Sequence, residues 1–426
     1  MHWGTGGQTA NGLTMEQKPI IHRAWVILAI CFANFFVIYS VRLGYGILLP
    51  QMSKSLSLTK AQGGLIYSFF FFAYLFFSPI FGNLNDRIGA RKVIGSFAIF
   101  SALGIAMMGI MFNFWSGVLF FAVAGFGTAT LYSPMISLIQ RWFGERRRGL
   151  ALGILQMGAA LGMASMGILL PILASQFDWR FCWFLLGGSM FILFLVNAFC
   201  LRNDPKELGL LPWENGPRSA PEKKKGRRAS YSEIFRLRLF WIIGISYFFT
   251  SASFYAIFTF IVMYGVMEIG LSHAIASGFV TLMSLAGLLG APIMLFLSDH
   301  VGRKKTILLC QLFIFLSASG LVLSKGSTAC LMTCVSVLGF FFHPVWPLYG
   351  ACARDYFKDH VTGTIVGLWT LFYGLGGVIA PAFAGYLADK TETFVYSFIF
   401  SIILVSLSFF FMFLAKDTGR VSPAET

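Results

Sequence analysis

The chain alternates long apolar blocks with short polar segments. Each block holds about 20 or more residues and is long enough to cross a ~30 Å hydrocarbon layer as an α-helix. The strands of a membrane barrel would need alternating segments of about ten residues, whereas these blocks are continuously apolar. The pattern therefore predicts an all-α polytopic membrane protein with 12 transmembrane helices, at residues 24–48, 62–83, 93–112, 114–140, 149–174, 180–201, 239–265, 273–297, 305–323, 328–353, 362–387 and 393–415.

The distribution of charge predicts how the chain is oriented. Hydrophobic residues make up 57% of the sequence and charged residues 12%, with a net charge of +15. If the N-terminus is cytoplasmic, 26 of the 32 Lys and Arg lie in inside segments, 5 lie in outside loops, and Arg42 lies within a span. This asymmetry is the positive-inside pattern of a protein in a lipid bilayer, and it gives no reason to expect a nucleic-acid partner. Both termini are predicted to be cytoplasmic, and the short loops favour a bacterial inner membrane.

One polar segment divides the spans into two sets of six. Residues 202–238 include the basic stretch "GPRSAPEKKKGRRAS" and are predicted to form a cytoplasmic linker, either simply solvated or touching anionic lipid. The predicted units are an N-terminal six-helix bundle at 1–201 and a C-terminal bundle at 239–426. Residues 1–23 are polar, so we expect no separate secretory signal before the first span.

The two halves are similar in sequence. An offset of 213 residues aligns "SPIFGNLNDRIGARK" (78–92) with "APIMLFLSDHVGRKK" (291–305), and an offset of 214 aligns residues 125–143 with 339–357 without a gap. A parallel duplication of a six-helix unit explains both matches. The two bundles are therefore expected to be pseudo-symmetric.

On these residues the chain resembles the major facilitator superfamily along essentially its full length. The stretch "GNLNDRIGARK" (82–92) has that family's loop signature, the second copy lies where the second half should carry it, and "RWFGERRRG" (141–149) is also similar to the family. The resemblance implies a secondary transporter that binds its substrate between two rocking halves. No "GxxxxGK[ST]" motif occurs, so transport driven by ATP is not supported.

Charged residues at the cytoplasmic helix ends suggest a gate. A carboxylate beside several arginines can make charge-assisted contacts that close this side of the protein. The alternative is a turn whose basic residues only fix the topology. The predicted gate residues are Asp86, Arg87, Arg91, Arg141, Asp299 and Arg303.

Arg42 stands about eighteen residues into the first span, where a charge costs about 2.5–3.5 kcal/mol on insertion scales. On a helical wheel Tyr39 and Tyr45 lie about 60° to either side of it, and Asn34 is on the same broad face. None of the seventeen Asp and Glu lies in the middle of a span. An arginine without an acidic partner is suited to binding a carboxylate through its planar fork, although it could instead snorkel to the outer interface.

The predicted substrate is therefore a small organic anion, with a monocarboxylate favoured. An arginine before a proline in the first helix is similar to the organic-anion branches of the superfamily. The chain departs from some of them at Val41, where others have an acid, and at Tyr255 or Ala256, where phosphate-ester exchangers have a second arginine. It also lacks the basic residue that monocarboxylate carriers usually keep in helix 8.

His343, close to Pro344 and Pro347 in the tenth span, is the proton-coupling candidate, because histidine titrates near neutral pH. A neutral histidine bonded to a local carbonyl is the alternative, and a counter-anion could replace the proton. Other polar or aromatic side chains could line the pocket or simply fill the core. These are Tyr132, Gln156, Tyr247, Tyr255, Trp346, Trp369 and Tyr373.

Two other functions remain open. A proton-coupled drug exporter usually needs a membrane acid and a "GPxxGG"-like run in helix 5, neither of which occurs. A transporter-like receptor that signals through the linker has no positive support. The seven cysteines show no zinc-ligand spacing, and no constellation of an enzyme is visible, so we expect neither metal nor cofactor nor catalysis. The chain is expected to work as a monomer.

Overall fold

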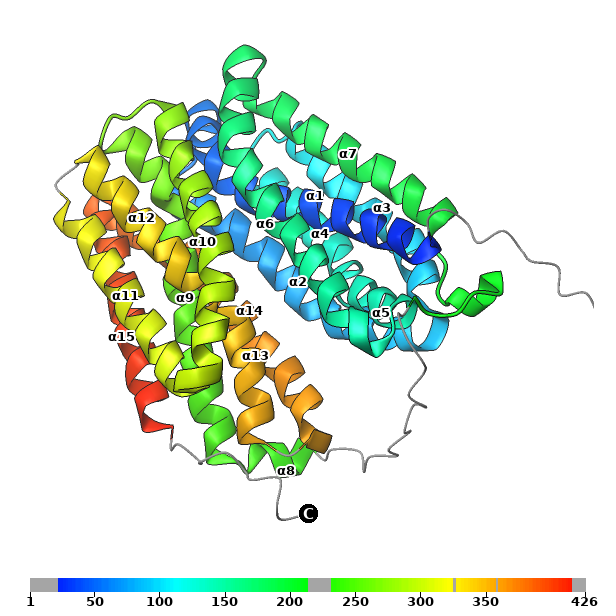
Figure 1. Ribbon diagram of the computed structural model, residues 1–426. Coiled ribbons are helices and arrows are strands. Elements are labelled where there is room, and N and C mark those ends of the chain that lie inside the picture. The colour runs from blue at the N-terminus through cyan, green and yellow to red at the C-terminus, as the bar shows by residue number, and fades with distance from the viewer. Residues whose placement is uncertain (1–21, 214–230, 325–326, 358, 416–426) are drawn as a thin grey trace, which may run out of the picture.

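The computed structural model describes residues 22–213, 231–324, 327–357 and 359–415 (Figure 1). Within these ranges, 12 helical segments are long and apolar enough to cross a membrane. This confirms the predicted all-α fold. The basic stretch at 216–230 and both chain ends lie outside the described residues.

The helices form two bundles and a connection between them. The N-terminal bundle holds α1 (Arg23–Leu56), α2 (Lys60–Ile88), α3 (Ala90–Met108), α4 (Phe114–Ala129), α5 (Tyr132–Trp142), α6 (Glu145–Gln176) and α7 (Trp179–Cys200). The connection includes η1 (Pro205–Leu208) and α8 (Tyr231–Phe235). The C-terminal bundle holds α9 (Arg238–Met267), α10 (His273–Val301), α11 (Arg303–Leu323), α12 (Thr328–Phe342), α13 (Val345–Tyr356), α14 (Asp359–Thr391) and α15 (Val395–Leu414).

The fourth and tenth spans are each divided into two helices, although the sequence pattern predicted one helix for each. Proline lacks an N–H, and its ring clashes with the carbonyl four residues earlier. Pro134 therefore breaks the helix near Thr130, and Pro347 breaks it near His343. The Thr130 hydroxyl donates to the carbonyl oxygen of Gly127 at 2.6 Å, which stabilises the first break.

Packing within each bundle follows the sequence repeat. In the N-terminal bundle α1 packs on α6, α2 on α4, and α3 on α7. The equivalent pairs in the C-terminal bundle are α9 with α14, α10 with α12, and α11 with α15, and all of them are in contact. The two halves are thus copies of one six-span unit, as the aligned segments predicted.

The start of the predicted linker is packed against the N-terminal bundle. The Trp213 N–H donates to the carbonyl oxygen of Trp142 at 2.9 Å, and the Gly144 N–H donates to that of Trp213 at 3.1 Å. The Trp213 ring lies 5.1 Å from the ring of Trp25 on α1. At least this part of the segment is therefore held in place rather than freely solvated.

We call the end of the bundles where α1 begins and α15 ends the terminal face, and the end near Leu56 and Lys60 the opposite face. The bundles meet toward the opposite face and diverge toward the terminal face (Figure 1). Bonds between the halves lie on the meeting side. The Asp389 carboxylate on α14 accepts bonds from the N–H groups of Lys60 and Ala61, at 2.8 and 2.7 Å. Asp389 thus caps the first turn of a helix in the other half.

Glycines let the halves approach this closely. A β-carbon at Gly64 of α2 would overlap the carbonyl oxygen of Pro381 of α14, and one at Gly385 of α14 would overlap that of Lys60. A β-carbon at Gly46 of α1 would lie 3.2 Å from the carbonyl oxygen of Thr259 on α9. Small residues at such crossings allow backbones to pack directly, as is common between membrane helices.

We predict that Gly64→Ala separates α2 from α14 and lowers the melting temperature of the purified protein in detergent by about 2 °C or more. The added methyl group meets backbone atoms of Pro381, which cannot rotate away. Gly153→Ala on α6 is the matched control, because nothing lies within 4 Å of its β-carbon position. Equal melting temperatures for the two variants would contradict the close crossing.

Candidate functional site

Arg42 is buried in the centre of the molecule rather than placed at one of its ends. Its relative exposure is 5%. Two of its nitrogens, Nε and Nη2, are buried with no hydrogen-bond partner among the described residues. A snorkelling arginine would instead extend to an interface, so the side chain does not have that arrangement.

Four aromatic rings surround the guanidinium. Measured from Arg42 Cζ, the ring centroids of Tyr74 and Phe71 lie at 4.6 and 5.0 Å, and those of Tyr39 and Phe70 lie at 5.4 and 5.8 Å. The faces of such rings carry partial negative charge and attract cations. In the part of the chain that the structure describes, no carboxylate forms an ion pair with Arg42. The rings therefore stabilise the charge in place of an acid.

The C-terminal half supplies the facing wall. The hydroxyls of Tyr255 on α9 and Tyr373 on α14 are hydrogen-bonded to each other, and both lie within electrostatic range of Arg42. The Tyr373 ring meets the ring of Trp346 edge-on at 4.0 Å. The Tyr247 ring lies 5.6 Å from that of Trp346. These four predicted residues are thus brought together opposite Arg42.

Two more predicted residues complete the N-terminal side. The Tyr132 hydroxyl on α5 interacts electrostatically with Gln156 on α6 and with Tyr39, Tyr74 and Arg42. Gln156 is exposed even though it lies well inside its span. We call Arg42, its four rings, Tyr132, Gln156 and the four C-terminal aromatics just described the Arg42 site.

The structure places Asn34 away from this group. Asn34 and Asn197 of α7 exchange two amide hydrogen bonds, at 3.0 and 2.9 Å, and the Asn34 amide also donates to the carbonyl oxygen of Ile30. Both residues are fully buried. The wheel placed Asn34 on the same broad face as Arg42, but a partner on α7 holds its amide between two helices.

Tyr45 and Trp369 are also separate from the site. The Tyr45 hydroxyl donates to the carbonyl oxygen of Gly63 at 2.7 Å, and its ring stacks on that of Tyr67. The Trp369 indole N–H donates to the carbonyl oxygen of Phe240 at 3.0 Å, near the terminal face. Each polar atom is satisfied by a backbone oxygen, so both side chains serve the packing of their own bundle.

His343 stands at the break between α12 and α13, three residues before Trp346 of the Arg42 site. Its Nδ1 lies 3.1 Å from the carbonyl oxygen of Gly339, and because a carbonyl only accepts, Nδ1 carries a proton. Nε2 is then the free acceptor of the neutral ring. The imidazole packs on Gly287 of α10 and lies edge-on to Phe342.

Helix α2 contributes side chains to the site that the sequence pattern did not indicate. Phe71 and Tyr74 contact Arg42, and the Tyr67 hydroxyl donates to the carbonyl oxygen of Arg42 at 2.8 Å. All three belong to the run "YSFFFFAYLFF" (67–77). The two tyrosines are the only polar aromatics in that run, which is the one signal that could have pointed to this face of the helix.

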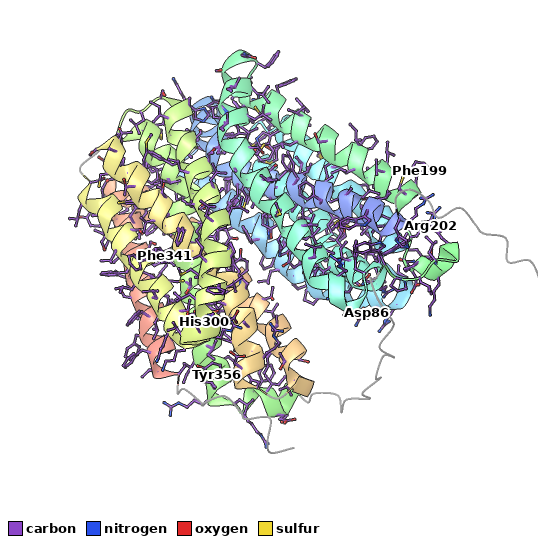
Figure 2. All side chains as sticks on the ribbon, in the orientation of Figure 1. Asp86, Phe199, Arg202, His300, Phe341 and Tyr356 are labelled. Atoms are coloured by element: carbon purple, nitrogen blue, oxygen red, sulfur yellow. The ribbon has the colours of Figure 1, made fainter. Side chains whose placement is uncertain are left out.

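The predicted gate residues lie on separate bundles. Arg303 bonds Asp299 at 2.5 Å and Asp355 at 3.4 Å, all within the C-terminal half. Asp86 is exposed at the diverging end of the other bundle, far from the end that carries His300 and Tyr356 (Figure 2). Among the described residues no ion pair joins the two halves. Closure of this side by Asp86, Arg87, Arg91, Arg141, Asp299 and Arg303 stays a prediction.

The site is equipped for binding an anion. It offers one cation with free donors, several hydroxyls that donate or accept, and ring faces that exclude water. Within the described residues, no three or more His, Cys, Asp or Glu form a group that could hold a metal ion.

Curated relatives match almost the whole chain. The hexuronate transporter of Bacillus subtilis is 24% identical over 84% of this chain and 86% of its own length. The probable galactarate/D-glucarate transporter GarP of Escherichia coli K12 is 23% identical over 89% and 91%. Mouse monocarboxylate transporter 12 is 23% identical over 93% and 86%.

A solved structure has the same fold. A bacterial homolog of the human lysosomal transporter Spinster, in an inward-facing and occupied conformation, superposes with a TM-score of 0.73 at 17% identity, covering 96% of this chain and 100% of that one. The family model described as Major Facilitator Superfamily matches residues 30–381 and 268–426. The chain therefore belongs to the Major Facilitator Superfamily, whose members are secondary transporters and not enzymes.

Proposed function

We propose that this transporter carries a small organic anion and that Arg42 binds its carboxylate. The observation that carries the proposal is the buried guanidinium whose Nε and Nη2 have no partner among the described residues. Nε and Nη2 lie on one edge of the planar fork, and two parallel bonds from that edge match the two oxygens of a carboxylate. A bound anion would satisfy both donors and neutralise the charge.

Charge balance favours a substrate with one negative charge. Arg42 is the only Lys or Arg in the middle of a span, and no Asp or Glu lies there. One carboxylate on one guanidinium gives a neutral pair, whereas a second carboxylate would leave a buried charge without a partner. The relatives support organic anions as the broader class, since they are named as transporters of hexuronate, of galactarate and D-glucarate, and of monocarboxylates.

The two faces alternate in giving access to Arg42. In this arrangement α2 and α14 close the opposite face, and the bundles diverge toward the terminal face. The positive-inside distribution supports a cytoplasmic terminal face, which makes this the inward-facing state. Rocking the halves about the crossing of α1 and α9 would expose the same site to the other side.

His343 is the proposed proton carrier if transport is coupled to protons. It stands at the break of the tenth span, with Nδ1 bonded to the carbonyl oxygen of Gly339 and Nε2 free to accept. Protonation at Nε2 would add a positive charge near the site as the anion arrives. Exchange against a second anion would need no such group.

We predict that Arg42→Gln lowers uptake of the transported acid by at least about 100-fold, because two charge-assisted bonds are lost. Arg42→Lys keeps the charge but not the fork and should lose about tenfold or more. The measurement is uptake of labelled lactate, pyruvate, formate, oxalate and glucuronate by purified protein in liposomes, with and without an inward proton gradient.

Arg23→Gln is the matched control, because Arg23 lies on the same helix but is exposed at the terminal face. It should transport like the unmodified protein. If Arg42→Gln and Arg23→Gln take up every acid equally well, the anion proposal is wrong.

We predict that His343→Gln removes the stimulation of uptake by an inward proton gradient but keeps exchange of labelled for unlabelled substrate. Glutamine preserves hydrogen bonding and cannot titrate. His300→Gln is the control, since His300 makes the same kind of bond to a carbonyl four residues earlier, at 3.0 Å, but is exposed near the terminal face. Stimulation that survives in His343→Gln would exclude this histidine as the proton carrier.

A further inference from the structure

Phe71 touches the binding cation and the opposite half of the protein at once. Its ring centroid lies 5.0 Å from Arg42 Cζ and 4.7 Å from the ring centroid of Tyr255 on α9. A β-carbon at Gly377 of α14 would lie 3.0 Å from two carbons of the Phe71 ring. The ring is thus enclosed by α1 on one side and by α9 and α14 on the other.

Two of the other rings around Arg42, those of Phe70 and Tyr74, pack within their own half. Phe70 packs on Phe121 of α4, with ring centroids 4.7 Å apart. Tyr74 belongs to a small apolar cluster with Val93 and Ala129, all within the N-terminal bundle. Among the described residues, Phe71 is the one of the four rings whose aromatic contacts cross to the C-terminal half.

The C-terminal side of this enclosure exists only while α2 and α14 are together. Gly374 and Gly377 of α14 receive Leu75 and Phe71 of α2, further along the same crossing that Gly64 and Asp389 close near the opposite face. If the opposite face opens, α14 separates from α2 and the Phe71 ring loses its contacts with the C-terminal half. The position of Phe71 therefore depends on whether the opposite face is closed.

We propose that Phe71 is a positioning residue for transport: closure of the opposite face presses its ring against Arg42 and fixes the guanidinium for the anion. This inference rests on the proposed function of Arg42. A flat ring on one side of the guanidinium limits its rotamers and leaves the edge with Nε and Nη2 free. The affinity for the anion is then coupled to closure of the opposite face.

The test is the KM and maximal rate of anion uptake in liposomes for Phe71→Leu, Gly377→Ala and the double variant. Phe71→Leu should raise KM about five- to thirtyfold, the range expected for a lost cation–π contact, with a maximal rate within about twofold of the unmodified protein. Gly377→Ala should raise KM as well, because its methyl group displaces the ring by a few tenths of an ångström. In the double variant the two effects should not add, since leucine leaves room for the methyl group.

Phe72→Leu is the matched control on the same helix, because Phe72 is 53% exposed on the surface of the bundle. A KM for Phe71→Leu equal to that of Phe72→Leu, or fully additive effects of the two substitutions, overturns the positioning role while Arg42 keeps its own. Unmodified protein that takes up none of the acids, or uptake that Arg42→Gln leaves intact, overturns the proposed function and this inference together.

Discussion

The buried charge of Arg42 is the constraint on which the centre of this transporter depends. A guanidinium within a span is tolerated only where the protein replaces the water it has lost. Here that replacement consists of four aromatic rings and several tyrosine hydroxyls rather than an acid. A carboxylate at this place would form a permanent ion pair and occupy the donors. Rings stabilise the cation without hydrogen-bonding its edge, so its binding capacity is kept.

The duplication explains why the Arg42 cation faces uncharged side chains of the other half. The repeat aligns Arg42 of α1 with Tyr255 of α9, and the two helices cross where Gly46 meets Thr259, which are also equivalent positions. In a duplicated fold, equivalent residues close to the pseudo-symmetry axis between the two halves face each other. This equivalent pair has diverged into Arg42 and Tyr255. The N-terminal half of the site is therefore charged, and the C-terminal half is lined by uncharged hydroxyl groups.

Close backbone contacts connect the Arg42 site to the closed opposite face. Because glycines allow α2 and α14 to meet without intervening side chains, a small rotation of one half separates them over several turns. The bonds from Asp389 to the first turn of α2 hold the closed arrangement at its far end. The crossing of α2 and α14 extends to Phe71, next to Arg42. The closed opposite face and the Arg42 site therefore share one contact surface.

From the amino-acid sequence alone we predict the number of spans, the duplicated plan and the single mid-membrane cation. These follow from hydropathy, charge and self-similarity along the chain, none of which needs knowledge of neighbours. It also indicated Tyr255, Tyr373, Trp346 and Tyr247, which the tertiary structure brings together.

Which polar side chains are free to bind a substrate depends on contacts between helices. Asn34 finds its partner on α7, and Tyr45 and Trp369 find backbone oxygens, and no helical wheel contains those partners. Phe71 and Tyr74 were hidden in a run of aromatics that looks alike on every face. A hydrogen bond or a ring contact depends on two elements at once, and their approach is set by packing rather than by either segment alone.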